Sequence, residues 1–128
     1  MMKKMSKEKV DIKELGIPNI CFSIADREMK EWDKYAEQRK ERGFDDTETW
    51  NLDQVICQFI EPRLRRFKEL TIGYPPSLTP ESWDEALDKM INAFSLMQKD
   101  LDEAREDDWE KVEEGLSLFC KHLRDLWW

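Results

Sequence analysis

The chain has 128 residues, the length of one ordinary domain, and 40% of them are hydrophobic, which is enough for a core without disulfide or metal support. Charged residues make up 39% of the chain, and 29 acidic against 21 basic side chains give a net charge of −8. A surface of this sign repels phosphates and anionic lipids, so the composition argues against direct binding of nucleic acid or membrane. The N-terminal residues lack the apolar segment of a signal peptide, and we expect a cytoplasmic protein.

The three cysteines, Cys21, Cys57 and Cys120, do not have the spacing of metal ligands. Because their number is odd, they cannot all form internal disulfides. We expect reduced thiols that act as apolar packing residues.

Residues 1–16 are predicted to form a flexible charged tail, and residues 17–128 a single helical domain. Ile20, Phe22 and Ile24 alternate along the start of this domain. A lone strand has nothing to pair with. We therefore expect residues 17–24 to form an extended arm that either packs on the helices or pairs with the same arm of a second protomer.

A first helix is predicted over residues 24–42. Ser23 and Asp26 have the spacing of a capping box, hydrophobic residues follow at helical intervals, and Gly43 supplies a C-terminal stop.

A second helix is predicted to begin between Asp46 and Asn51, which are both good N-cap residues. Its apolar stripe, from Leu52 to Phe67, keeps the same phase on both sides of Pro62. This continuity predicts one helix with a kink at the proline rather than two separate helices.

The third helix is predicted from Thr79 to about Lys99, and the fourth from near Asp107 to the end of the chain with Trp127 in its apolar stripe. Gly115 in the fourth helix predicts a weak point that costs about 1 kcal/mol relative to alanine. These patterns predict an all-α fold, with about four amphipathic helices in an antiparallel bundle and an extended N-terminal arm.

The residues argue against most forms of catalysis. His122 is the one histidine, so neither a serine or cysteine triad nor the paired Glu-x-x-His ligands of a di-iron bundle can be assembled. No glycine-rich phosphate loop is present. We assign no catalytic residue, no metal ligand and no cofactor.

One enzymatic alternative stays open, in which carboxylate pairs hold Mg²⁺. The spacings of Glu28 with Glu31, Glu81 with Asp84, and Asp84 with Asp88 put each pair on one helical face. All-helical nucleotide pyrophosphohydrolases use such pairs, although the spacing also arises by chance in so acidic a chain.

The segment between residues 43 and 67 has the most unusual composition, because an acidic loop precedes a cluster of arginines. Guanidinium groups bind phosphate or carboxylate in a bidentate manner, so this region can form an anion seat, or its charges can pair with one another. The aromatic residues beside the loop can either anchor the start of the second helix or form the rim of a binding site. The candidate ligand- or partner-binding residues are Phe44, Asp45, Asp46, Glu48, Trp50, Arg63 and Arg66.

Trp127 and Trp128 close the sequence. We expect at least one of them to be exposed unless a partner covers it, and self-association is one way to bury it.

Several short motifs of the chain are distinctive. They are Arg-Gly-Phe-Asp-Asp-Thr-Glu-Thr-Trp-Asn-Leu-Asp at 42–53, Ile-Glu-Pro-Arg-Leu at 60–64, Gly-Tyr-Pro at 73–75, Ser-Trp-Asp-Glu at 82–85 and Lys-Met-Ile at 89–91. Together they resemble the motifs of a family of small uncharacterised phage and prophage proteins. The resemblance implies an intracellular product made during phage growth or from a prophage. No catalytic residue comes with it.

We therefore expect a small acidic phage-type accessory protein that binds a host or phage protein, or itself, without catalysis. Inhibition of a host defence component is one such role. The alternatives are a protein that binds or sequesters a nucleotide, with Arg63 and Arg66 on phosphate and Trp50 or Phe44 on the base, and the Mg²⁺-dependent pyrophosphohydrolase.

Overall fold

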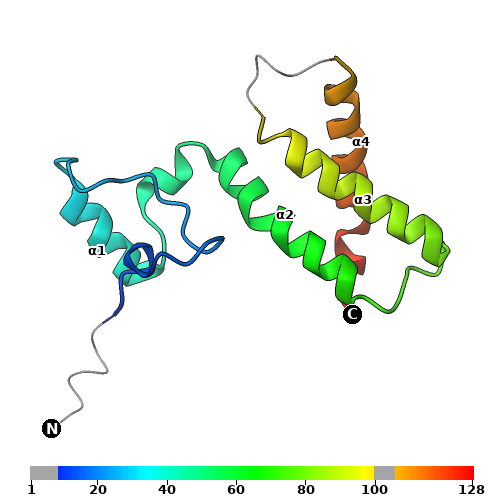
Figure 1. The fold of residues 1–128 in the computed structure, drawn as a ribbon, viewed down its shortest axis with the longest axis horizontal. Helices are drawn as coiled ribbons and strands as arrows, with labels where there is room; N and C mark the ends of the chain where they lie inside the picture. The colour runs from blue at the N-terminus through cyan, green and yellow to red at the C-terminus, as the bar shows by residue number, and fades with distance from the viewer. Residues whose placement is uncertain (1–8, 100–105) are drawn as a thin grey trace, which may run out of the picture. The chain divides into compact units, whose positions relative to one another are not determined.

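The computed structural model describes residues 9–99 and 106–128 (Figure 1). Regular structure in these ranges is entirely helical. The α-helices are α1 (Trp32–Arg42), α2 (Leu52–Leu70), α3 (Pro80–Leu96) and α4 (Glu106–His122), and the 3-10 helices are η2 (Ile12–Leu15), η3 (Asp46–Thr49) and η5 (Leu123–Asp125). The predicted all-α fold is thus confirmed over the described ranges. None of these helices is long and apolar enough to cross a membrane.

The chain forms two compact units, Met1–Val55 (unit 1) and Ile56–Trp128 (unit 2). This division differs from the expected tail followed by one domain. Asp11, inside the expected tail, is only 7% exposed, whereas residues 1–8 lie outside the described ranges. Asp11 is buried because its carboxylate binds Arg39. The high charge of the segment had predicted a flexible tail at this position.

In unit 1, α1 is shorter than predicted and begins at Trp32. The predicted capping box at Ser23 and Asp26 is wrong, because the Ser23 hydroxyl donates to Asp45 instead of capping a helix. The predicted end at Gly43 is correct. Gly43 has a φ of 88°, in the left-handed region, and its N–H donates to the carbonyl of Arg39 at 2.8 Å.

The N-terminal arm packs on its own chain, which was one of the two predicted arrangements. The backbone N–H of Phe22 donates to Glu48 Oε1 at 2.9 Å, and that of Ile24 donates to Thr47 Oγ1 at 3.1 Å. Side chains of η3 thus supply the acceptors that a neighbouring strand would otherwise provide.

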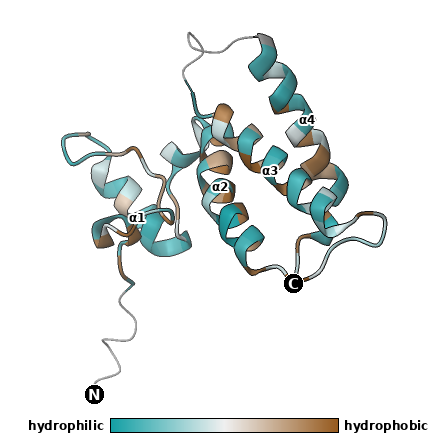
Figure 2. Cartoon of the chain, turned by 45° about the vertical axis from the view of Figure 1, so that its right-hand side comes forward, coloured by the Kyte–Doolittle hydropathy of each residue, from teal (hydrophilic) through white to brown (hydrophobic). Residues whose placement is uncertain are grey.

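Unit 2 contains a hydrophobic core to which α2, α3 and α4 all contribute, and Figure 2 shows hydrophobic residues (brown) on each of these helices. α2 continues through Pro62, as its unbroken stripe predicted. α3 begins at a capping box in which Thr79 and Ser82 bind each other's backbone N–H groups. The buried core residues are Cys57, Leu64, Trp83, Ala86, Leu87, Met90, Ile91 and Phe94.

α3 and α4 approach each other closely at Gly115. A Cβ at this position would lie 2.4 Å from Ala93 Cβ and 2.4 Å from the Lys89 carbonyl oxygen. The prediction that Gly115 is only a weak point in α4 is therefore incomplete, because the missing side chain is what allows the two helices to approach.

α4 ends at His122, and the predicted continuation of the helix to the end of the chain is wrong. The 3-10 helix η5 follows, and Trp127 and Trp128 lie beyond it without helical structure. The side chain of Asp125 in this turn contacts His122 Nδ1 at 2.9 Å.

We predict that Gly115→Ala destabilises unit 2 by about 1–3 kcal/mol, because overpacking at the α3–α4 contact outweighs the gain of about 1 kcal/mol in helix propensity. Urea unfolding followed by circular dichroism measures the change. Ser117→Ala, at an exposed position of the same helix, is the control and is expected to be neutral or slightly stabilising. An equal gain in stability from both substitutions would contradict the close approach.

Candidate functional site

A buried arginine organises the loop of unit 1 that carries five of the predicted site residues. Arg39 is 1% exposed. Its Nε and Nη2 donate to the two carboxylate oxygens of Asp11 at 2.8 and 2.9 Å, and its Nη1 donates to Asp45 Oδ2 at 2.7 Å. This fork joins the N-terminal segment, α1 and the loop before η3.

The charged state of this cluster is stabilised by its own hydrogen bonds. The Arg39 hydrogen bonds lower the pKa of Asp11 below its usual value, although burial opposes the shift. Burial raises the pKa of Asp45, but hydrogen bonds from Ser23, Thr47 and Arg39 together outweigh it, and the net shift is downward. The hydrogen bonds with Asp11 and Asp45 raise the pKa of Arg39, although burial opposes this shift. These shifts describe a structural ion cluster with all partners in place.

The other loop carboxylates also have partners inside unit 1. Asp45 and Glu48 form a capping box at the start of η3. Asp46 accepts hydrogen bonds from Arg42 at 2.7 Å and from Gln38 at 2.9 Å, and the bond from Arg42 lowers its pKa. The predicted acidic loop is thus used to hold unit 1 together.

The two aromatic residues of the loop remain about half exposed, with Phe44 at 45% and Trp50 at 55%. The Arg42 guanidinium lies 4.4 Å from the centre of the Phe44 ring, and Trp50 packs edge-on against Tyr35. Both contacts suit the interpretation of these residues as anchors of the loop.

Arg63 and Arg66 have partners on α2 itself. Arg63 lies over the Phe59 ring, 3.9 Å from its centre, and donates to the Phe59 carbonyl. Arg66 pairs with Glu69 at 3.2 Å. The predicted pairing of these arginines with the acidic loop would join unit 2 to unit 1, and it stays a prediction.

The carboxylate pairs of the Mg²⁺ alternative are not assembled into a ligand set. Within residues 9–99 and 106–128, no group of three or more His, Cys, Asp or Glu side chains is placed to hold a metal. Lys68 Nζ lies 2.6 Å from Asp88 and 3.8 Å from Asp84. Glu28 and Glu31 precede α1 and so do not share a helical face.

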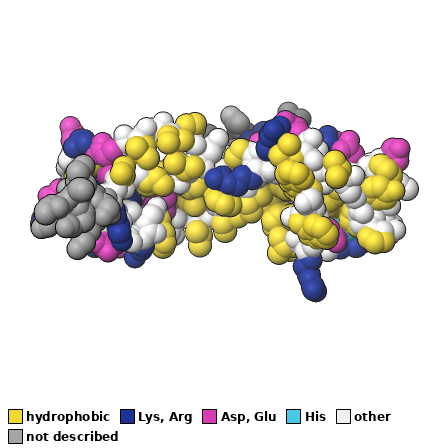
Figure 3. Space-filling view, turned by 90° about the horizontal axis from the view of Figure 1, so that it is seen from below, with side chains coloured by type: hydrophobic (Ala, Val, Ile, Leu, Met, Phe, Trp, Pro, Cys, Tyr) yellow, Lys and Arg dark blue, Asp and Glu magenta, His cyan; other side chains and the backbone are white. Residues whose placement is uncertain are grey.

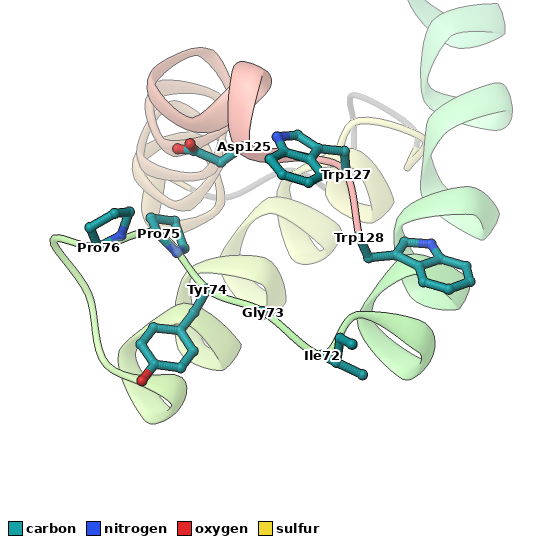
Figure 4. Close-up of a pocket in the computed structure, with 8 residues that line it drawn as sticks. All are labelled: Ile72, Gly73, Tyr74, Pro75, Pro76, Asp125, Trp127 and Trp128. Atoms are coloured by element: carbon teal, nitrogen blue, oxygen red, sulfur yellow. The ribbon is translucent and has the colours of Figure 1, made fainter.

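Sequence reasoning missed a cleft in unit 2 that has a volume of about 330 Å³ (Figure 4). One wall is the segment after α2, and the other is the turn and final residues after α4. The lining residues are Ile72, Gly73, Tyr74, Pro75, Pro76, Asp125, Trp127 and Trp128. We call this surface the aromatic cleft. Its volume is near the lower end of the range of about 300–1,000 Å³ for ligand sites.

The hydrophobic side chains of the cleft are unusually open to solvent. Trp127 is 76% exposed, Trp128 64%, Ile72 89% and Tyr74 51%. Figure 3 shows hydrophobic side chains (yellow) at the surface of both units in the view from below. The expectation that at least one of the two tryptophans is exposed is confirmed for both.

Packing just below the surface holds the second wall in place. His122 is 3% exposed and packs edge-on against Trp83, with ring centres 5.3 Å apart. Leu126 packs against the core of unit 2. The adjacent Trp127 and Trp128 extend outward from this anchored turn (Figure 4). The sequence signals for the cleft were a Gly-Tyr-Pro-Pro loop and two tryptophans at the end of the sequence. That these two segments lie close together is seen only in the three-dimensional fold.

No protein-family model, no curated protein and no solved structure matches this chain.

We predict that Arg39→Met destabilises unit 1 by about 3–5 kcal/mol, because Asp11 and Asp45 are then left buried without their counter-ion. Hydrogen exchange of the Phe22 and Ile24 amides reports the loss. Arg42→Met is the matched control and should cost less than about 1 kcal/mol, since its pair with Asp46 is exposed. Similar losses for both variants would refute the role of the buried cluster.

We predict that unit 1 is acid-sensitive. The pKa values of Asp11 and Asp45 are lower in the folded protein than the ordinary value of 3.8, so the unfolded chain takes up protons first. Their contribution to stability is therefore complete above that value and is lost as the pH falls through the lower, folded pKa values.

An acid titration followed by the Phe22 and Ile24 amide signals in NMR tests this prediction, with the core amides of unit 2 as internal reference. Asp45→Asn should flatten the acid dependence of unit 1. Retention of the native unit 1 signals well below the ordinary aspartate pKa in both chains, until unit 2 also unfolds, would contradict the prediction.

Proposed function

We propose that this is a non-catalytic, cytoplasmic accessory protein that binds a partner protein through the aromatic cleft of unit 2. The observation that carries the proposal is the exposure of Trp127 and Trp128 beside Ile72 and Tyr74 around one cleft. Large exposed apolar clusters are characteristic of interaction sites, and tryptophan and tyrosine are frequent anchors of protein interfaces.

The charged residues that were predicted to form a site already have partners within the protein, and this indirectly supports the aromatic cleft as the binding site. The loop carboxylates and the arginines of α2 have partners close to them in the chain. Over the described residues, no buried side-chain nitrogen or oxygen lacks a hydrogen-bond partner. No specific observation favours the nucleotide-binding alternative.

The nature of the partner follows from the resemblance to small phage and prophage proteins. We propose a host or phage protein, with inhibition of a host defence component as one possible outcome of binding. The acidic first half of α4 would steer a basic partner surface and disfavour nucleic acid. Self-association through the same tryptophans is the competing arrangement.

We predict that a tagged full-length chain retains a specific protein from bacterial host lysate, and that Trp127→Ala combined with Trp128→Ala reduces retention at least about tenfold, because such anchors dominate binding energy. Quantitative mass spectrometry measures the retained protein. Trp109→Ala is the matched control, since Trp109 is 51% exposed but lies near the start of α4.

Equal retention by the natural chain and the double variant would refute the role of the cleft. If no protein is enriched and light scattering shows a monomer, the proposed function is wrong. A dimer that the double variant abolishes would instead establish self-association.

A further inference from the structure

The two walls of the aromatic cleft present different chemistry at its two ends. In Figure 4, Trp128 and Ile72 lie at one end, and Asp125 lies at the other, beside Pro75. Trp127 lies between them on the upper wall, and Tyr74 is on the lower wall. The surface therefore combines an apolar, ring-rich part with a single carboxylate.

The ring-rich part suits an extended chain better than a helix or a compact side chain. Grooves lined by aromatic rings bind proline-containing segments, whose polyproline II conformation is already extended and loses little entropy on binding. The flat rings of Trp127, Trp128 and Tyr74 can pack against pyrrolidine rings without requiring a hydrogen bond from each partner residue.

The charged end selects a cation. Among the described residues that line the cleft, Asp125 is the one with a charged side chain, and this side chain is 39% exposed. Its Oδ2 contacts His122 Nδ1 at 2.9 Å. Unit 2 has 16 acidic and 10 basic side chains, a balance of −6, so its field also attracts a basic segment.

This inference rests on the proposed function and specifies the partner. We infer that the aromatic cleft binds an extended, proline-containing segment of a partner protein, with a lysine or arginine of that segment facing Asp125. The prolines pack on Trp127, Trp128 and Tyr74, and the cation pairs with the carboxylate. A second copy of this chain is a poorer occupant, because each copy has a net charge of −8.

The test uses the full chain and an oriented library of short peptides in which each position is fixed in turn. We expect enrichment of proline together with lysine or arginine at a constant spacing. For the selected peptide, replacement of the basic residue by glutamate should weaken binding at least about tenfold, and added salt should weaken binding of the basic form. Replacement of the prolines by serine should weaken binding to a similar extent.

Three variants locate the peptide on the protein. Trp127→Ala should abolish measurable binding, Asp125→Asn should remove most of the preference for a basic residue, and Trp109→Ala should change neither. The indole N–H signals of Trp127 and Trp128 should shift on binding in NMR, while that of Trp109 stays in place. If Asp125→Asn perturbs the turn, the charge-swapped peptide tests the ion pair on the unaltered chain.

A library that selects neither proline nor a basic residue, or no peptide at all, overturns this inference. If Trp127→Ala with Trp128→Ala still abolishes capture of a protein from lysate, only the chemistry of the ligand is wrong and the proposed function stands. If a peptide binds the cleft but the double variant captures the same lysate protein as the natural chain, the proposed function is wrong. A dimer in solution that buries both tryptophans overturns the inference in favour of a second copy.

Discussion

The contact at Gly115 is the constraint on which the geometry of unit 2 depends. The absence of a side chain there allows α4 to approach the Lys89–Ala93 turn of α3. Further along the same helix, at its end, His122 packs against Trp83 of α3. The aromatic cleft is built on that end. A wider separation of the two helices would move one wall of the cleft without altering any residue that lines it.

Unit 1 is stabilised by a buried polar centre, whereas unit 2 is stabilised by an apolar core. Arg39 binds Asp11 and Asp45, which come from segments on either side of α1. Removing charges from water is costly, so such a centre is stable only when every partner is correctly placed. This requirement explains why the Ser23 hydroxyl and the η3 side chains are occupied with hydrogen bonds. It also explains why a loop that is rich in charge need not be a binding site.

Periodicity predicted the all-α fold, the continuous α2 and the start of α3 because these features depend on neighbours along the chain. Unit 1 could not be predicted in the same way, since the bonds between Arg39 and Asp11 join residues far apart in sequence. Ser23 illustrates the difficulty, as its spacing to Asp26 fits a local cap while its hydroxyl binds Asp45. The candidate site was missed for the same reason. Its two walls, at residues 72–76 and 125–128, are separated by all of α3 and α4.

The change from α4 to η5 explains why the tryptophans of the cleft are exposed. In a continuous helix, Trp127 would follow Leu123 by four residues and lie on the same stripe as the core positions of α4. The 3-10 turn, in which Asp125 contacts His122, breaks this register. Leu126 then packs against the core, and the next two residues extend outward. A single turn therefore leaves Trp127, which helical periodicity assigned to the apolar stripe of the fourth helix, exposed beside Trp128.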